Sequence, residues 1–186
     1  MSTSLSVCII CKNEAETIGE CLESVKWADE IIVVDSGSED NTIEIAKRYT
    51  DNVYIEADWQ GFGEQRRRAE RYASHDWVFA IDCDEVVTTE LKDEILAVLK
   101  NIKTEQVLML NRLTKFCGQY IFHSGWHPDC IARIYNKKVT GYNKNLVHES
   151  VDIQKVAKVY LKEKLLHNQD DELFDYINKR NRYAKL

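Results

Sequence analysis

Asp82 and Asp84 are two aspartates one residue apart that directly follow the apolar run Trp77–Ile81. In an extended segment, side chains two positions apart share a face, and a turn can bring both carboxylates toward one ion. Hard oxygen ligands of this kind favour Mg²⁺ or Mn²⁺. Such an ion would stabilise the charge of a departing diphosphate. The alternative is a pair of loop aspartates that cap the next helix.

Two further polar clusters follow apolar runs in the same way. Cys11–Glu14 comes after the run Leu5–Ile10, and Ser36–Ser38 comes after the run Glu30–Asp35. Asp35 is predicted either to accept hydrogen bonds from a ribose or base, or to cap the helix that follows. Neither G-x-G-x-x-G nor G-x-x-x-x-G-K-[ST] is present, which weakens a dehydrogenase or P-loop assignment.

Apolar runs and helical patterns alternate through the first half of the chain. We expect strands over 5–10, 30–35, 52–57, 77–81 and 106–111, with helices over 14–26, 42–49, 64–74 and 89–102 between them. Asn13 and Glu16 are expected to cap the first helix. This alternation predicts an α/β fold with a mostly parallel sheet and helices on both faces. Ligands bind such sheets at the carboxyl ends of the strands, where the three polar clusters lie.

The second half of the chain has a different pattern. It predicts loops over 116–128, strands over 130–135 and 156–161, and a charged helix over 170–186. We therefore expect one continuous domain with two parts: residues 1–112, an α/β half that carries the three polar clusters, and residues 113–186, a small mixed region.

Composition restricts the class of protein. The formal net charge of −6 argues against a nucleic-acid partner, and only Arg66, Arg67 and Arg68 form a tight basic cluster, suited to a single diphosphate. The sequence has no run of 18 apolar residues, so we expect no membrane-spanning helix. The N-terminus is predicted to form a strand rather than a signal peptide, and the six cysteines to be free thiols in a reducing, cytoplasmic setting. Cys8 and Cys11 are expected to point to opposite faces of one strand.

The motifs resemble family 2 glycosyltransferases of the GT-A fold over most of the chain. The wider likeness rests on residues 6–14, 32–42, 61–66 and 77–85. A narrower likeness to bacterial lipopolysaccharide core glucosyltransferases rests on Gly125–Asp129, Val147–Glu149 and Lys179–Ala184. The resemblance implies a UDP-sugar donor, a divalent cation (Mg²⁺ or Mn²⁺), inversion at the anomeric carbon and a glycan or lipid-linked saccharide acceptor.

The resemblance also implies that residues 1–112 bind the nucleotide sugar and that residues 113–186 form the acceptor side, and it implies roles for particular residues. Asn13 and Glu14 would lie beside the nucleotide and Asp35 on its uridine, while Asp82 would lie near the ribose and Asp84 would hold the metal. His167 resembles the late histidine that completes the metal site in many GT-A enzymes. Gln65 and Arg66 are the remaining donor-side residues, with Arg66 reaching the base or the phosphates.

Inversion needs a general base to take the proton of the incoming hydroxyl. Asp129, in the His-Pro-Asp loop, and Glu149, in Val-His-Glu, both qualify, and each has a structural alternative as a loop carboxylate. Trp126 is a candidate to stack on an acceptor sugar, although such a residue is more often part of a core. His148 is a second acceptor-side candidate, and a lone histidine is more often structural.

The chain departs from the family pattern at two places. Arg67 stands where the family usually has Asn, which would alter donor contacts or strengthen phosphate binding. The chain also ends soon after the Arg182-Tyr183-Ala184 motif, which leaves acceptor contacts and contact with a membrane surface open. Two alternatives remain: a non-catalytic nucleotide-sugar binder, and a sugar-1-phosphate nucleotidyltransferase. The second expects a Gly-rich first loop, which Cys11–Glu14 is not.

Overall fold

Four short apolar runs form the parallel half of one twisted sheet. The computed structural model describes residues 3–168, so the helix expected over 170–186 lies outside the described residues. β1 (Leu5–Cys11) lies between β2 (Glu30–Asp35) and β4 (Trp77–Asp82), and β3 (Val53–Ile55) pairs with β2. All these pairings are parallel. Every residue of β1 is buried, as expected of a central strand covered on both faces.

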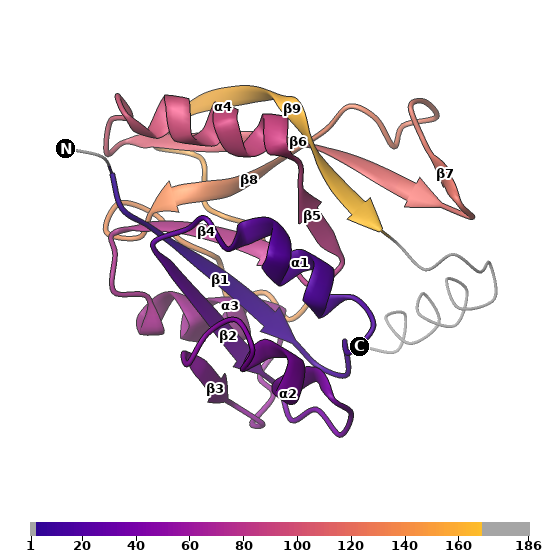
Figure 1. Cartoon of the computed structure of the whole chain (residues 1–186). Helices are drawn as coiled ribbons and strands as arrows, with labels where there is room; N and C mark the ends of the chain where they lie inside the picture. Colours follow the sequence, from indigo (N-terminus) through magenta and orange to yellow (C-terminus); the bar gives the residue numbers. More distant parts are fainter. Residues whose placement is uncertain (1–2, 169–186) are drawn as a thin grey trace.

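The helices cover both faces of this sheet. α1 (Ile18–Val25), α2 (Thr42–Ala46) and α4 (Thr89–Leu99) contribute to the core on one face, and α3 (Phe62–Tyr72) packs on the other. Figure 1 shows α1 and α4 on the same side of the sheet. The predicted α/β fold with helices on both faces is confirmed. Within β1, Cys8 belongs to one core and Cys11 to the other, which confirms that their side chains point to opposite faces.

The second half of the chain adds antiparallel and mixed pairing. Its strands are β5 (Glu85–Val87), β6 (Gln106–Phe116), β7 (Gln119–Tyr120), β8 (Asp129–Asn136) and β9 (Ala157–Asn168). The strand order is β3-β2-β1-β4-β8-β6-β9-β5, with β7 paired to β6. β8 runs antiparallel between β4 and β6. The boundary proposed at residue 112 falls inside β6, so both parts of the chain share one sheet.

Several expected elements differ from those observed. β6 and β9 are longer than predicted and pair in parallel with each other, while β5 was not predicted. The proposed cap of the first helix is wrong: its N-cap is Thr17. The Asn13 side chain instead accepts a hydrogen bond from Glu39 N at 2.8 Å. Asn13 has a φ of 56°, so it turns the chain out of β1 and does not begin a helix.

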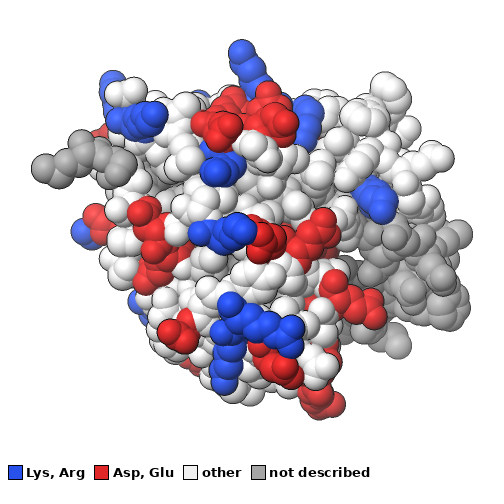
Figure 2. Space-filling view, in the orientation of Figure 1, with Lys and Arg blue, Asp and Glu red and all other residues white. Residues whose placement is uncertain are grey.

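Charges of both signs are interspersed over the surface. Figure 2 shows basic and acidic side chains alternating on one face of the molecule, with no continuous basic stripe on that face. Among the described residues, no helix is long and apolar enough to cross a bilayer.

Candidate functional site

Asp82, the last residue of β4, is held between two buried arginines. Arg66 of α3 contacts its Oδ1 through Nη2, and Arg133 of β8 contacts its Oδ2 through Nη2. Both arginine side chains are almost fully buried, whereas the Asp82 side chain keeps 28% of its exposure. Both carboxylate oxygens are therefore engaged, and the orientation of Asp82 is fixed by two different elements, α3 and β8.

The same ionic network continues through Glu85 to Asp129. Arg133 Nη2 lies 2.7 Å from Glu85 Oε1, and Arg112 Nη1 lies 3.5 Å from the same oxygen. Arg112 also contacts Asp129 Oδ2 through Nε at 2.9 Å and through Nη2 at 2.8 Å. This last pair follows from strand register, because Arg112 of β6 lies opposite Asp129 of β8.

Burial and charge act in opposite directions on the two carboxylates of this network. For Asp82, burial would raise the pKa, but Arg133 and Arg66 outweigh it and hold the pKa well below its usual range. For Glu85, burial raises the pKa, and the Asp82 charge adds to that effect against the pull of Arg133. Asp82 is therefore the fixed negative charge of the network, and Glu85 takes up a proton more readily.

Asp84 points to a different partner from Asp82. Its Oδ2 lies 3.3 Å from His167 Nε2. The pairing of β5 with β9 creates this contact, because it places His167 opposite Glu85, and Asn168 N donates to Asp84 O at 2.8 Å. Thr114 Oγ1 lies 3.1 Å from His167 Nδ1, which fixes the orientation of the ring. The structure thus brings together the two residues predicted to hold a metal.

A carboxylate and an imidazole are a donor set that suits Mn²⁺, and the carboxylate suits Mg²⁺ as well. Within residues 3–168, no three His, Cys, Asp or Glu side chains are close enough together to hold a metal ion by themselves. The two predicted ligands therefore fit an ion whose remaining positions are filled by water and by oxygens of a bound ligand, as is usual for Mg²⁺ with phosphates.

The loops after β1 and β2 bind each other at the same edge of the sheet. Asn13 N donates to Ser38 Oγ at 2.8 Å, and Glu14 N donates to Thr42 Oγ1 at 2.7 Å. Asp35 is fully buried, and its Oδ1 accepts from Gly37 N and Ser38 N at 2.8 and 2.7 Å. Asp35 thus stabilises its own turn, and the N-cap of α2 is Asn41. A contact of Asp35 with a uridine stays a prediction that requires this turn to open.

Two residues predicted on the donor side contact neighbouring groups of the protein. Gln65 is fully buried, its Nε2 donates to Ser36 Oγ at 2.9 Å and to Glu56 O at 3.1 Å, and its Oε1 accepts from Arg68 at 3.0 Å. Its whole amide supports the neighbouring loops, so a direct nucleotide contact by Gln65 stays a prediction that requires these hydrogen bonds to be exchanged. Arg66 keeps only 4% exposure and its Nη2 is paired with Asp82, so a direct contact of Arg66 with a base or a phosphate stays a prediction.

The acceptor-side candidates lie on two loops. Trp126 is half-buried with its ring 5.6 Å from that of Phe116, so it is anchored and still accessible. His148 is exposed and has a φ of 58°. Next to it, Glu149 Oε1 lies 3.6 Å from Arg66 Nε, which brings this carboxylate to the ionic network. Asp129 joins the same network from the opposite side, through Arg112.

Arg133 and Arg112 are the site residues that sequence reasoning missed. Arg133 lies in the apolar strand Cys130–Tyr135, where a charged residue at a buried position requires a partner. That mismatch is the signal that would have identified it. Arg112 gave no such signal, because it becomes important only through its register with Asp129.

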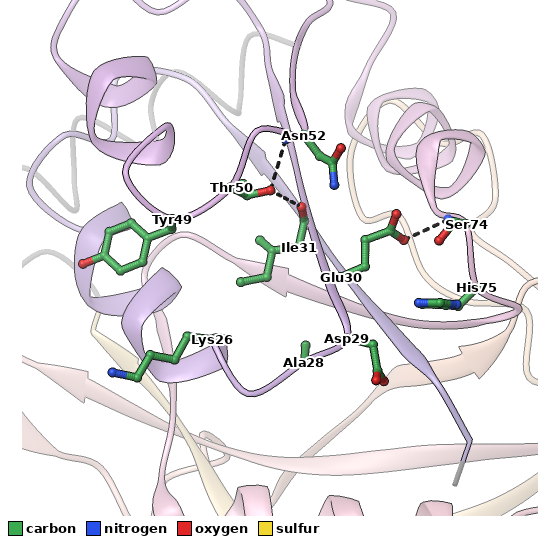
Figure 3. A pocket seen from close by; sticks show the side chains of 10 residues that line it. All are labelled: Lys26, Ala28, Asp29, Glu30, Ile31, Tyr49, Thr50, Asn52, Ser74 and His75. Atoms are coloured by element: carbon green, nitrogen blue, oxygen red, sulfur yellow. Dashed lines mark hydrogen bonds between the residues drawn. The ribbon is translucent and has the colours of Figure 1, made fainter. Parts of the chain in front are cut away.

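The hollow drawn in Figure 3 lies at the other end of the strands. It has a volume of about 370 Å³ and includes Glu30, the first residue of β2, whereas the acidic network lies at the carboxyl ends. Its polar side chains bind neighbouring groups: Glu30 accepts from Ser74 N at 2.8 Å, and Thr50 donates to Ile31 O at 2.8 Å. This hollow is separate from the candidate site.

Comparison with known proteins identifies the family. The model of the family described as "Glycosyl transferase family 2" matches residues 6–166, which include the site residues described above except His167 and Asn168. This chain belongs to glycosyltransferase family 2. An uncharacterized glycosyltransferase of Rickettsia typhi is 31% identical over 191 residues, covering 97% of this chain and 65% of the relative. The chain thus spans about two thirds of the length of that relative.

A second curated relative and a solved structure are also similar to this chain. The lipopolysaccharide core biosynthesis glycosyltransferase LpsC of Rhizobium meliloti is 28% identical, covering 98% of this chain and 69% of the relative. The crystal structure of Staphylococcus aureus TarS 1–349 in complex with UDP-GlcNAc superposes with a TM-score of 0.63 at 17% identity, covering 91% of this chain and 60% of that chain. The second likeness supports the GT-A fold of this family 2 chain.

The family assignment also gives Arg67 a context. Arg67 Nη1 donates to Tyr142 O at 3.1 Å. At the position where the resemblance led us to expect Asn, this family 2 member therefore has a side chain that holds a later segment of the chain. The contact favours neither of the donor-side roles considered for Arg67.

Proposed function

We propose that this chain is an inverting, metal-dependent glycosyltransferase. It transfers a sugar, glucose by the narrower resemblance, from a UDP-sugar to a hydroxyl of a lipopolysaccharide core or another glycan. One observation carries the proposal: Asp82, clamped by Arg66 and Arg133, and the Asp84–His167 pair lie at the carboxyl end of β4. The family assignment and the likeness to LpsC support the reaction class and the acceptor.

On the donor side, Asp84 and His167 would hold Mg²⁺ or Mn²⁺. When bound, the ion would supply the positive charge that a departing diphosphate needs. Asp82 keeps a fixed negative charge beside this pair and would orient the ribose. Asn13 and Glu14, in the loop after the adjacent strand β1, would lie beside the nucleotide.

On the acceptor side, a carboxylate would take the proton of the attacking hydroxyl. Asp129 and Glu149 are the candidates, each in contact with an arginine of the network. Trp126 would present a ring to the apolar face of an acceptor sugar, and His148 would contact the acceptor from the other loop. With a lipid-linked acceptor, the protein would work in the cytoplasm at the inner face of the membrane, as a peripheral protein.

The test is release of UDP from UDP-sugars in the presence of glycan acceptors, with the anomeric configuration of the product read by NMR. We expect activity that a chelator abolishes and that added Mn²⁺ or Mg²⁺ restores. Asp84→Asn should lower kcat by about 100-fold or more, since the loss of a charge-stabilising group typically costs that much. Asp76→Asn is the matched control, because Asp76 pairs with Lys138 on the exposed surface.

Activity that persists in a chelator would contradict the metal-dependent part of this proposal. Tight UDP binding by calorimetry without turnover on any acceptor would favour the non-catalytic nucleotide-sugar binder. Formation of a nucleotide sugar from a sugar 1-phosphate would favour the nucleotidyltransferase.

A further inference from the structure

The first turn of α3 is capped by a loop that comes much later in the chain. Its N-cap is Gly61, which has no side chain to accept a hydrogen bond from the free N–H groups. Phe62 N donates to Leu146 O and Gly63 N donates to Asn145 O, each at 3.1 Å. Backbone carbonyls of the loop therefore do what a capping side chain usually does.

The close approach of the later loop to α3 requires glycine at two positions. A Cβ at Gly63 would lie 2.4 Å from Asn143 O and 2.8 Å from Asn145 O. A Cβ at Gly61, whose φ is +99°, would lie 2.7 Å from Leu146 Cα. All these neighbours are backbone atoms, which cannot rotate away as the end of a side chain can. Gly61 and Gly63 therefore form a notch, called the glycine notch below, into which the later loop fits.

The rest of α3 holds the same loop further along the helix. Arg67 donates to Tyr142 O, and Glu70 Oε1 accepts from Tyr142 N at 3.2 Å. The Arg66 guanidinium carbon lies 5.3 Å from the centre of the Tyr142 ring, within the range of a cation–π contact. Residues 142–149, the docked segment, are thus attached to α3 at its first turn and again in its second half.

The docked segment ends at Glu149, beside the arginine that holds Asp82. Glu149 Oε1 lies 3.6 Å from Arg66 Nε, and its side chain keeps 16% exposure. The distance is that of an ion pair, longer than a direct hydrogen bond. Asp129, by contrast, is gripped by two nitrogens of Arg112 at 2.8 and 2.9 Å. Of the two candidate bases, Glu149 therefore has the looser contact with its arginine. In addition, the helix that anchors the loop of Glu149, α3, also carries the arginine that pairs with its carboxylate.

We propose that Gly63 is a positioning residue: by leaving room for the docked segment, it fixes Glu149 as the carboxylate that accepts the proton of the acceptor hydroxyl. This inference rests on the proposed function. The proton passes from the hydroxyl to the carboxylate as the new glycosidic bond forms and UDP leaves, so no other reactant is required. Arg67 supports the same placement through Tyr142.

The test is Gly63→Ala in the full chain, assayed for sugar transfer. We expect kcat to fall by roughly 10- to 100-fold, because a small misplacement of a catalytic group can lower the rate by such a factor. The KM for the UDP-sugar should not change. Gly19→Ala is the matched control: it is also helical, and its Cβ would meet only Ile45 Cγ2 at 3.7 Å, so it should leave kcat unchanged.

A double-mutant cycle decides between positioning and a merely structural role. If Gly63 acts through Glu149, adding Gly63→Ala to Glu149→Gln should lower kcat no further. An equal loss in both backgrounds, or an unchanged kcat for Gly63→Ala, would overturn the inference. If Gly63→Ala does not fold, Arg67→Met takes its place in the same cycle, with the same two outcomes.

Hydrogen exchange gives a readout that is independent of activity. In Gly63→Ala, amides of residues 142–149 should exchange faster than in the native chain, while those of β1 should not change. Unaltered exchange in the docked segment would also overturn the inference. Failure of the proposed function is distinguishable, because the native chain itself would then transfer no sugar.

Discussion

Replacing Arg133 by Met should destabilise the protein far more than replacing an exposed cation. Arg133 is the shared partner of Asp82 and Glu85, and its loss would leave both carboxylates short of a counter-charge. Breaking a buried pair typically costs about 3–5 kcal/mol. We expect the lower end, about 3 kcal/mol, because Asp82 keeps Arg66 and 28% exposure, and because the raised pKa of Glu85 eases its protonation. At about 2–4 °C per kcal/mol for a chain of this size, the Tm should fall by roughly 6–12 °C.

The assay is thermal unfolding of the full chain, with two companion variants. Lys138→Met removes an exposed cation that pairs with Asp76 and should cost about 1 kcal/mol or less. Adding Glu85→Gln to Arg133→Met should recover about 1–2 kcal/mol, because the stranded buried charge is then removed. Equal Tm losses for Arg133→Met and Lys138→Met, or a double variant less stable than Arg133→Met alone, would refute the view that Arg133 compensates buried charge.

Three further outcomes follow from the structure. The pKa of Glu30 lies below its ordinary value of 4.5: burial opposes the shift, but hydrogen bonds from Ser6 and Ser74 prevail. The ionised Glu30 therefore stabilises the fold above pH 4.5, and this contribution is lost as the pH falls through the lower pKa of the folded state. The Tm of Glu30→Gln should consequently fall less on acidification than the Tm of the native chain. An identical fall of Tm with pH in the two proteins would contradict this. A thiol reagent should modify only Cys117 and Cys130 before denaturation, since the other four cysteines are buried, and rapid reaction of a third thiol would count against the burial described. Trp126→Ala should raise the acceptor KM without affecting UDP binding, and weaker UDP binding by calorimetry would reassign this ring to the donor side.

Local patterns were sufficient to predict the first half of the fold. β1, β2 and β4 are short buried runs between helices, and the half-exposed β3 continues the same alternation, so their order and parallel pairing follow from general rules. β5 was missed because it has three residues and follows a turn directly. The strand predicted for β9 was too short because the second half of β9 mixes charged residues with apolar ones. Its full length is set by pairing with β6 and β5.

For the candidate site, sequence reasoning found the acids but not what holds them. Asp84 and His167 were predicted together, and the structure places them in contact. The different contacts of Asp82 and Asp84 were not predictable from their spacing, because those of Asp82 depend on arginines from α3 and β8. These arginines reach Asp82 only after α3 and β8 have packed beside β4, and the mismatch of a charged Arg133 in an apolar strand indicates that a partner is needed without saying which residue it is.

The position of β8 bears on how this fold can be recombined. β8 is hydrogen-bonded on one side to a strand of the parallel half and on the other to β6, and it also carries Arg133 and Asp129. A hybrid enzyme spliced at residue 112 would join two halves of a single strand, and its imported β8 would have to match a foreign β4 in both register and charge. Exchanging only the loop between β7 and β8 leaves the pairing of β8 with β4 and β6 intact. If that loop contacts the acceptor, as proposed above, acceptor preference should be easier to transfer by this route than by exchanging the C-terminal half.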